Sequence, residues 1–273
     1  MIGVFDSGVG GLTVLQHFLK DLPQYKYIYL GDNANVPYGN KSSEIIYNYS
    51  KKAVDFLNSQ GCKIIIFACN SASSQALRRI QQEYLPEKYP NVKVLGVIRP
   101  IAEKIASFKN IKKIGIIGTK ATINSNVYDR ELFSLRSDIE IIQKATPLLV
   151  PLIEESWLNK PETKMILKKY LLTLKTKQID SLILACTHYP FLLKDIRRIM
   201  GKSCLVLDPG KIVSDSLKDY LERHQEIKLE KYLNNSNDSS CIFYTTDDPI
   251  KFEELGSFFL SKKIKGVQKI ELK

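Results

Sequence analysis

The chain alternates between short apolar runs and longer stretches in which an apolar residue recurs every three or four positions. The short runs are rich in Ile, Val and Leu, as buried strands are, and the longer stretches have the repeat of a helix with one buried face. We expect strands at 2–5, 26–30, 63–68, 92–98, 113–118, 139–143, 180–185 and 204–207, and helices at 11–21, 43–59, 72–84, 100–107, 124–135, 162–175, 190–200 and 211–223. This alternation predicts an α/β fold with mainly parallel sheets flanked by helices.

Two of the apolar runs match each other. One reads Ile-Ile-Ile-Phe-Ala-Cys-Asn-Ser over 64–71, and the other reads Leu-Ile-Leu-Ala-Cys-Thr-His over 182–188. Each is followed by a helical stretch that contains Arg-Arg-Ile, at 78–80 and at 197–199. The repeat predicts two pseudo-symmetric halves with one cysteine each at the end of a strand. Because ligands bind beyond the carboxyl ends of parallel strands, both thiols stand where chemistry occurs in α/β proteins, and we expect them to face one ligand.

The repeat also predicts how the chain divides into domains. We expect a discontinuous first α/β domain, residues 1–95 plus 206–273, and a second α/β domain, residues 96–205. The return of the C-terminal segment to the first domain has the least support from the pattern alone. Within that segment, the polar residues 234–240 predict an exposed loop before a strand at 241–244.

Composition narrows the class of protein. The 273 residues are 44% apolar, which is enough for buried cores. No apolar run approaches the roughly 20 residues needed to span a membrane, and the N-terminus opens directly into a predicted strand. We therefore expect a cytoplasmic protein without a membrane partner. The five cysteines are widely spaced and lack a Cys-x-x-Cys pattern, so we expect neither a disulfide framework nor a metal site.

The formal net charge is +11, from 40 basic and 29 acidic residues. Lysine dominates the basic set and is spread along the chain in pairs such as Lys51-Lys52 and Lys262-Lys263. No arginine-rich arm or aromatic RNA-binding motif accompanies the charge, so the sequence disfavours a nucleic-acid partner. The same positive field favours a small anionic substrate.

Cys69 and Cys186 carry the main chemical signal. A cysteine after an apolar run is usually an inert buried residue, and Cys62 and Cys204 fit that description. Cys69 and Cys186 stand instead where a strand passes into a helix, and the N–H groups at a helix start favour a thiolate. The same two junctions supply amide, hydroxyl and imidazole groups suited to hold a carboxylate or an ammonium group: Asn70, Ser71, Thr187 and His188.

Two turns near the N-terminus carry further candidates. Asp6 and Ser7 open a glycine-rich turn at the end of the first predicted strand, but its glycine spacing fits neither a dinucleotide fingerprint nor a P-loop. Tyr38 and Gly39 lie in a turn-forming segment after the second predicted strand and offer a hydroxyl and a backbone amide. Either turn is also compatible with a purely structural role.

Two titratable residues complete the candidate set. His188 lies two positions after Cys186, where an imidazole that titrates near neutral pH can poise a thiol or return a proton. Glu154 ends an apolar approach in a pair of acids, a pattern that equally fits the start of a helix. The residues alone do not single out Glu154.

Together these motifs resemble the glutamate racemase family. The matching segments occur in the family's order and are Asp6-Ser7-Gly8-Val9-Gly10-Gly11-Leu12-Thr13, Gly31-Asp32 with Pro37-Tyr38-Gly39, Ala68-Cys69-Asn70-Ser71, Gly118-Thr119 with Ala121-Thr122-Ile123, Val150-Pro151-Leu152-Ile153-Glu154, and Cys186-Thr187-His188-Tyr189-Pro190. The resemblance therefore covers most of the chain. Ser71 stands where threonine is more usual in the family, a change that keeps the hydroxyl.

The resemblance implies a racemase that interconverts L- and D-glutamate without a cofactor and supplies D-glutamate for bacterial peptidoglycan synthesis. It implies that Cys69 deprotonates D-glutamate with the help of Asp6, and that Cys186 deprotonates L-glutamate with the help of His188 and Glu154. The substrate-contact positions that it implies are Asp6, Ser7, Tyr38, Gly39, Asn70, Ser71, Thr187 and His188. The family fold has two α/β domains with the site between them, and the C-terminal segment rejoins the first.

Other functions remain open at this point. An aspartate racemase would share the fold and both cysteines, although the segment 187–190 and the first glycine-rich turn favour glutamate. A thiol hydrolase or redox enzyme would use Cys186 and His188 as nucleophile and base, but would leave the matching Cys69 unexplained. A basic module that binds nucleic acid would need neither cysteine. The sequence also leaves the oligomeric state open, a homodimer included.

Overall fold

The computed structural model describes residues 1–229 and 240–273. Its strands are β1 (Ile2–Asp6), β2 (Tyr27–Gly31), β3 (Ile64–Phe67), β4 (Lys93–Gly96), β5 (Lys113–Gly118), β6 (Glu140–Ala145), β7 (Ser181–Ala185), β8 (Cys241–Thr245) and β9 (Gln268–Lys269). They form a six-stranded sheet of order β4-β3-β1-β2-β8-β9 and a three-stranded sheet of order β6-β5-β7. Neighbouring strands run parallel, as in β1 with β2 and β5 with β7. The predicted α/β class with mainly parallel sheets is confirmed.

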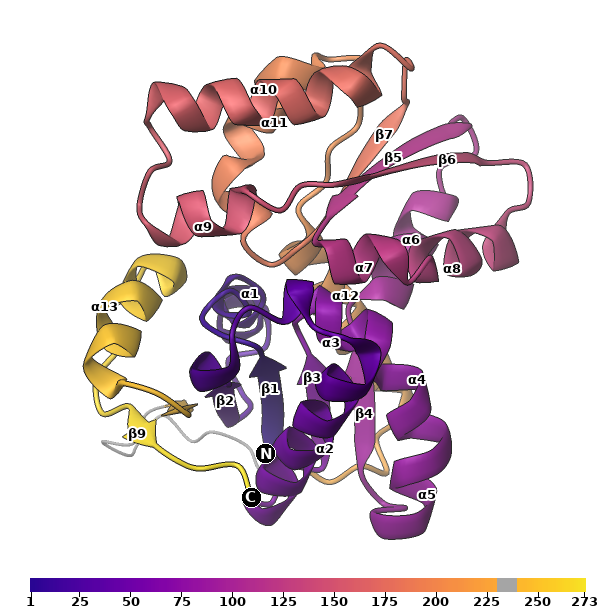
Figure 1. The fold of residues 1–273 in the computed structure, drawn as a ribbon. Helices are drawn as coiled ribbons and strands as arrows, with labels where there is room; N and C mark the ends of the chain where they lie inside the picture. The colour runs from indigo at the N-terminus through magenta and orange to yellow at the C-terminus, as the bar shows by residue number, and fades with distance from the viewer. Residues whose placement is uncertain (230–239) are drawn as a thin grey trace.

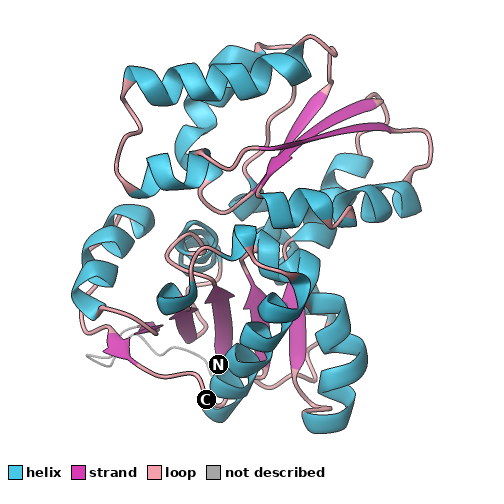
Figure 2. Cartoon of the chain, viewed as in Figure 1, coloured by secondary structure: helices cyan, strands magenta, loops and turns pink. Residues whose placement is uncertain are grey.

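Helices cover both sheets (Figure 2). They are α1 (Leu12–Asp21), α2 (Ser43–Ser59), α3 (Asn70–Gln75), α4 (Leu77–Arg79), α5 (Leu85–Lys88), α6 (Ile98–Ala106), α7 (Lys120–Asn124), α8 (Val127–Leu135), α9 (Leu149–Glu154), α10 (Pro161–Lys175), α11 (Leu193–Met200), α12 (Pro209–Arg223) and α13 (Pro249–Leu260). Single turns occur at Asn33–Asn35, Tyr38–Asn40 and Tyr189–Leu192, and a π-helical turn occupies Ile80–Tyr84.

The two sheets share a common arrangement of three strands. β1 lies between β2 and β3 in the larger sheet, and β5 lies between β6 and β7 in the smaller one. The two motif cysteines directly follow equivalent strands, because Cys69 lies two residues after β3 and Cys186 one residue after β7. The internal repeat of the sequence therefore corresponds to an internal repeat of the fold.

We call the six-stranded sheet with α1 to α5 and α13 the first lobe, and the three-stranded sheet with α6 to α11 the second lobe (Figure 1). The first sheet is buried on both faces. Ile64 and Ile66 of β3 join one apolar cluster, while Ile65 and Phe67 join another on the opposite face. This alternation explains why β3 appears in the sequence as an unbroken apolar run.

The chain passes between the lobes twice, once between β4 and β5 and once between β7 and β8. Helix α12 follows the second crossing and packs against both α1 and α6. The domain limits at 95/96 and 205/206 stay predictions. Among the described residues, no helix is long and apolar enough to cross a membrane.

Several predicted elements differ from the structure. Residues 204–207 do not form a strand: Leu205 makes an isolated bridge to Ser181, and Arg197 donates two hydrogen bonds to the carbonyl of Val206. The predicted helix at 124–135 is divided into α7 and α8 at Asn126, whose φ of 51° breaks the helical run. Helix α13 was not predicted, and the polar segment 234–240 lies, except for its last residue, outside the described residues.

Candidate active site

The cysteine-bearing ends of the two lobes enclose a cavity of ≈ 280 Å³. Both Cys69 and Cys186 line it. The other predicted residues that line it are Ser7, Tyr38, Gly39, Asn70, Ser71, Glu154, Thr187 and His188. Asp6 is not among the described residues that line the cavity, and its side chain is buried at the end of β1, where the glycine-rich turn begins. A volume of this size fits a small molecule such as an amino acid.

Cys69 sits at the start of α3, which belongs to the first lobe. Its Sγ accepts a hydrogen bond from the N–H of Ala72 at 3.5 Å, and it lies 3.5 Å from the hydroxyl of Ser7. Burial and the nearby Asp6 carboxylate together raise the pKa of the Cys69 thiol to about 12, against the smaller lowering effects of these hydrogen bonds. Cys69 is therefore a protonated thiol near neutral pH.

The Asp6 carboxylate accepts hydrogen bonds from both lobes. Its Oδ1 accepts a hydrogen bond from the N–H of Gly8 at 2.9 Å, and its Oδ2 accepts one from the hydroxyl of Thr187, in the second lobe, at 3.4 Å. Burial raises the pKa of Asp6 above its usual range, although the charge of His188 and these hydrogen bonds oppose the shift. Asp6 is thus placed to hold or exchange a proton beside the Cys69 half of the site.

The second cysteine has different surroundings. Sγ of Cys186 lies 3.8 Å from Nδ1 of His188, and Nε2 of His188 lies 2.9 Å from Oε1 of Glu154. Burial disfavours a charged imidazole, but the interactions with Cys186 and Glu154 outweigh it and raise the pKa of His188 to about 10. His188 is therefore an imidazolium at neutral pH and can stabilise negative charge on the sulfur beside it.

The polar residues around the cysteines are held by contacts between the lobes. The hydroxyl of Tyr128, on α8, donates to Oδ1 of Asn70 at 2.8 Å, and the hydroxyls of Ser71 and Thr119 lie 2.9 Å apart. On the opposite side, the hydroxyl of Thr13 donates to the carbonyl of Thr187 at 2.9 Å. The position of each lobe thus fixes side chains of the other.

Tyr38 and Gly39, in the second predicted turn, have structural contacts in addition to lining the cavity. The hydroxyl of Tyr38 donates to Oδ2 of Asp32 at 2.6 Å, so it serves the turn and is not free to meet a carboxylate. Gly39 faces Thr119 across the lobe boundary, and a Cβ at Gly39 would lie only 2.8 Å from the Cβ of Thr119. Glycine is therefore required there by the close approach of the two lobes.

Sequence reasoning missed several residues that line the cavity. Thr119 and Lys120 follow β5, and Thr146 and Pro147 follow β6. Each of these pairs lies at the carboxyl end of a parallel strand, the position that singled out Cys69 and Cys186, so the same rule applied to every strand would have found them. Among the described residues, no group of three or more His, Cys, Asp or Glu side chains is arranged to hold a metal ion.

Comparison with known proteins decides the family. The model of the Asp/Glu/Hydantoin racemase family matches residues 11–216. A glutamate racemase from a Sulfurihydrogenibium species is 41% identical over 272 residues, which are 99% of this chain and 97% of that protein. The chain belongs to the glutamate racemase family. It is a racemase by this membership, and its cysteine-lined cavity lies where the two lobes of the family fold meet.

Solved structures of the family agree with this assignment. A glutamate racemase from Bacillus anthracis is 32% identical, with a TM-score of 0.89 over 100% of this chain and 97% of that one. A glutamate racemase from Francisella tularensis, solved in complex with D-glutamate, is 34% identical, with a TM-score of 0.88 over 99% of this chain and 97% of that one. The two-lobed architecture of the racemase is therefore shared with these enzymes.

Proposed function

We propose that the chain interconverts L- and D-glutamate by direct proton transfer at the α-carbon, with Cys69 and Cys186 as the two proton-transferring groups. The observation that carries the proposal is that two thiols from equivalent strands of the two lobes line one cavity of ≈ 280 Å³. Glutamate as the substrate is supported by the names of the relatives and by the D-glutamate complex from Francisella tularensis.

The chemistry requires one thiolate and one thiol. The thiolate takes the α-proton, the C–H electron pair stays on the α-carbon, and the opposite thiol delivers its proton to the other face. With L-glutamate bound, Cys186 acts as the base beside protonated His188, and protonated Cys69 acts as the acid. The sulfurs exchange roles in the reverse reaction, where Asp6 assists removal of the proton from Cys69.

The carbanion-like transition state needs stabilisation that the protein supplies through fixed dipoles. N–H and O–H groups of Asn70, Ser71 and Thr187 line the cavity and are suited to hold the α-carboxylate as it takes up negative charge. The same three residues are anchored across the lobe boundary, so little reorganisation is needed when charge develops.

The wider role follows from this reaction. We propose that the D-glutamate produced serves bacterial peptidoglycan synthesis in the cytoplasm. Assembly as a homodimer stays a prediction.

The test replaces each cysteine in turn. We expect Cys69→Ser and Cys186→Ser each to lower racemisation at least about 1000-fold, because a serine hydroxyl is a far poorer base and acid pair for this step. In heavy water, the wild-type protein should incorporate deuterium at the α-carbon of both enantiomers. Cys204→Ser is the matched control, since Cys204 is also buried but does not line the cavity.

Two results would overturn the proposal. Turnover within tenfold of the wild type in either cysteine variant would exclude two-base catalysis. A covalent adduct on Cys186 without α-hydrogen exchange would indicate a thiol hydrolase instead. Parallel assays with L-aspartate test the side-chain preference, and faster racemisation of aspartate would reassign the substrate.

A further inference from the structure

A buried tyrosine of the second lobe contacts a cavity residue of the first. Tyr128 lies on α8, its side chain is fully buried, and it does not line the cavity among the described residues. Its hydroxyl donates to Oδ1 of Asn70 at 2.8 Å. Asn70 is the first residue of α3 and directly follows Cys69. The hydrogen bond therefore runs from outside the cavity to a side chain on its wall.

The local structure holds Tyr128 in this place. Asn126, in the left-handed region with φ of 51°, separates α7 from α8, and its carbonyl accepts the N–H of Arg130 in the first turn of α8. Tyr128 and Leu132 are one helical turn apart and are both fully buried, so this face of α8 points inward. The position of the tyrosine hydroxyl is thus set by the fold of the second lobe.

In the structure, the Asn70 amide points its oxygen at the Tyr128 hydroxyl. Oδ1 accepts the hydrogen bond from Tyr128. Nδ2 has no hydrogen-bond partner among the described residues, and it is not fully buried. Because Asn70 lines the cavity, we infer that Nδ2 faces into it. An amide rotated by 180° would present its oxygen there instead, which repels a carboxylate.

We propose that Tyr128 is a positioning residue that locks the Asn70 amide with its N–H donors toward the substrate carboxylate. This inference rests on the proposed function, because it takes an amino acid as the ligand. It adds a role for a residue that touches no substrate and belongs to the opposite lobe from Asn70. The contact also makes the orientation of the amide depend on the lobes being correctly docked.

Two observations support the contact as a stable one. Burial and the charge of Cys186 raise the pKa of Tyr128 above its usual value, so the hydroxyl stays protonated and remains a donor at working pH. Two neighbouring contacts hold α3 against α7 independently: Ser71 with Thr119 at 2.9 Å, and the Gln75 amide with the carbonyl of Ala121 at 2.6 Å. Loss of the Tyr128 hydroxyl alone should therefore leave the lobes docked.

The test removes the hydroxyl and keeps the ring. We expect Tyr128→Phe to raise the KM for both enantiomers about tenfold, the effect of one lost hydrogen bond, with kcat within about threefold of the wild type. Tyr27→Phe is the matched control. Tyr27 is equally buried and donates to the carbonyl of Leu22 at 2.8 Å, but it lies away from the cavity, so its KM should not change.

A double-mutant cycle separates positioning from a general structural effect. If Tyr128 acts through Asn70, the Tyr128→Phe, Asn70→Ala double variant has the KM of Asn70→Ala alone. Asn70→Asp keeps the acceptor for Tyr128 but removes the N–H donors, and we expect it to raise KM as Asn70→Ala does, even if Tyr128→Phe folds poorly. Additive effects on KM, an unchanged KM in Tyr128→Phe, or a wild-type KM in Asn70→Asp would each overturn the inference. An inactive wild-type protein would instead contradict the proposed function.

Discussion

The two motif cysteines occupy equivalent positions but have opposite electrostatic environments. Cys69 lies near the buried carboxylate of Asp6, and burial together with that charge raises the pKa of Cys69 to about 12. Cys186 lies 3.8 Å from His188, whose pKa is raised to about 10. Cys69 thus has a carboxylate beside it and Cys186 a cation, so the two halves of the site differ in charge although the cysteines are matched in position.

Glu154 contacts His188 at 2.9 Å in the Cys186 half of the site. We expect Glu154→Gln to lower the pKa of His188, because burial would then be opposed by Cys186 without the Glu154 charge. His188 would lose its proton at lower pH, so the alkaline limb of the pH profile of kcat/KM should move down from about 10. Because L- and D-glutamate have equal free energies, kcat/KM must fall by the same factor in both directions.

The measurement is kcat/KM for each enantiomer from pH 6 to about pH 11, beyond the wild-type limb. Glu155→Gln is the matched control, since Glu155 is the next residue along the chain and is exposed. Its profile should overlay that of the wild type. An alkaline limb that stays in place in Glu154→Gln would show that the contact at 2.9 Å does not control the protonation of His188.

At the scale of elements, α13 packs against His188 through an aromatic side chain. Its Phe259 is buried, with ring centroids 5.2 Å from His188 and 4.5 Å from Phe191, and so joins the first lobe to the turn that follows Cys186. The Phe259 and His188 rings pack edge to face, with an interplanar angle of 78°. A helix at the far end of the chain thus helps to hold a side chain that faces the cavity.

We expect Phe259→Ala to lower the free energy of unfolding by about 3–5 kcal/mol, the usual range for deleting a buried phenylalanine. Catalysis should weaken as well, because the His188 ring loses a packing partner. Urea denaturation followed by circular dichroism measures the first effect. Ile250→Ala on the same helix is the control: its side chain is 69% exposed, so the change should stay within about 0.5 kcal/mol.

The elements that the sequence predicted well are those with a local signal. Strands such as β3 and β7 are short continuous apolar runs, and the polar residues after them, Asn70 and Thr187, needed only the strand-end rule. Helix α13 was missed because Ile250 and Phe258 are exposed apolar residues that obscure its buried face. Tyr128 has no local signal at all, since its role depends on contact with a residue 58 positions away.

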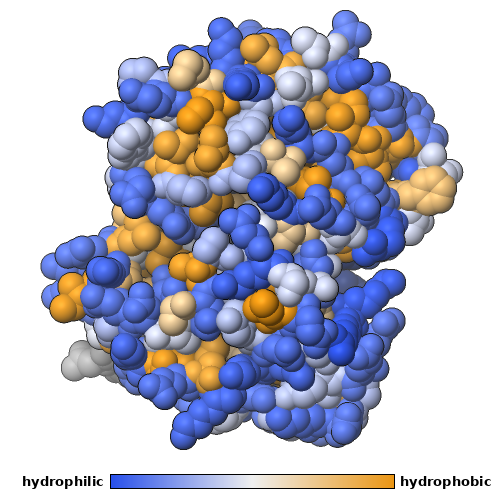
Figure 3. All heavy atoms as spheres, in the orientation of Figure 1, coloured by the Kyte–Doolittle hydropathy of each residue, from blue (hydrophilic) through white to orange (hydrophobic). Residues whose placement is uncertain are grey.

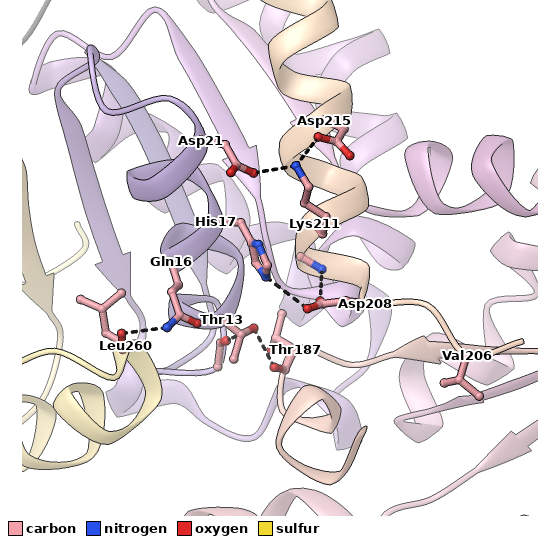
Figure 4. A network of polar contacts seen from close by, with 12 residues as sticks. Thr13, Gln16, His17, Asp21, Thr187, Val206, Asp208, Lys211, Asp215 and Leu260 are labelled. Carbon is pink, nitrogen blue, oxygen red and sulfur yellow. Dashed lines mark hydrogen bonds and ion pairs between the residues drawn. The ribbon is translucent and has the colours of Figure 1, made fainter. Parts of the chain in front are cut away.

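At the scale of the whole molecule, the second crossing between the lobes is fixed by a polar network (Figure 4). Arg197 of the second lobe donates a hydrogen bond to the carbonyl of Val206. Two residues later, Asp208 caps α12 by accepting a hydrogen bond from the N–H of Gly210 at 2.9 Å. His17 on α1 lies 3.3 Å from the Asp208 carboxylate, so the cap also ties the crossing to the first lobe. Lys211 extends the network by pairing with Asp21 of α1 at 3.1 Å.

The charge of Asp208 should therefore contribute to stability in a pH-dependent way. Burial opposes that charge, but hydrogen bonds from His17 and from the N–H groups of Gly210 and Lys211 outweigh it and lower the pKa of Asp208. A group whose pKa is lowered on folding stabilises the protein above its unfolded pKa, about 3.9, and this contribution is lost as pH falls through the lower folded value. Asp208→Asn keeps the cap, because an amide oxygen still accepts the N–H of Gly210, and removes only the charge.

We expect Asp208→Asn to lower the free energy of unfolding by about 0.5–1 kcal/mol at pH 6, as for a partly exposed ion pair, and the difference from the wild type to fade below about pH 4. Denaturant titrations between pH 3 and pH 6 measure it. Asp215→Asn, which removes a more exposed partner of Lys211 on the same helix, should have a smaller effect. A difference for Asp208→Asn that persists unchanged at pH 3 would mean that the carboxylate charge does not hold the crossing, and that the cap and the packing of α12 on α1 do so alone.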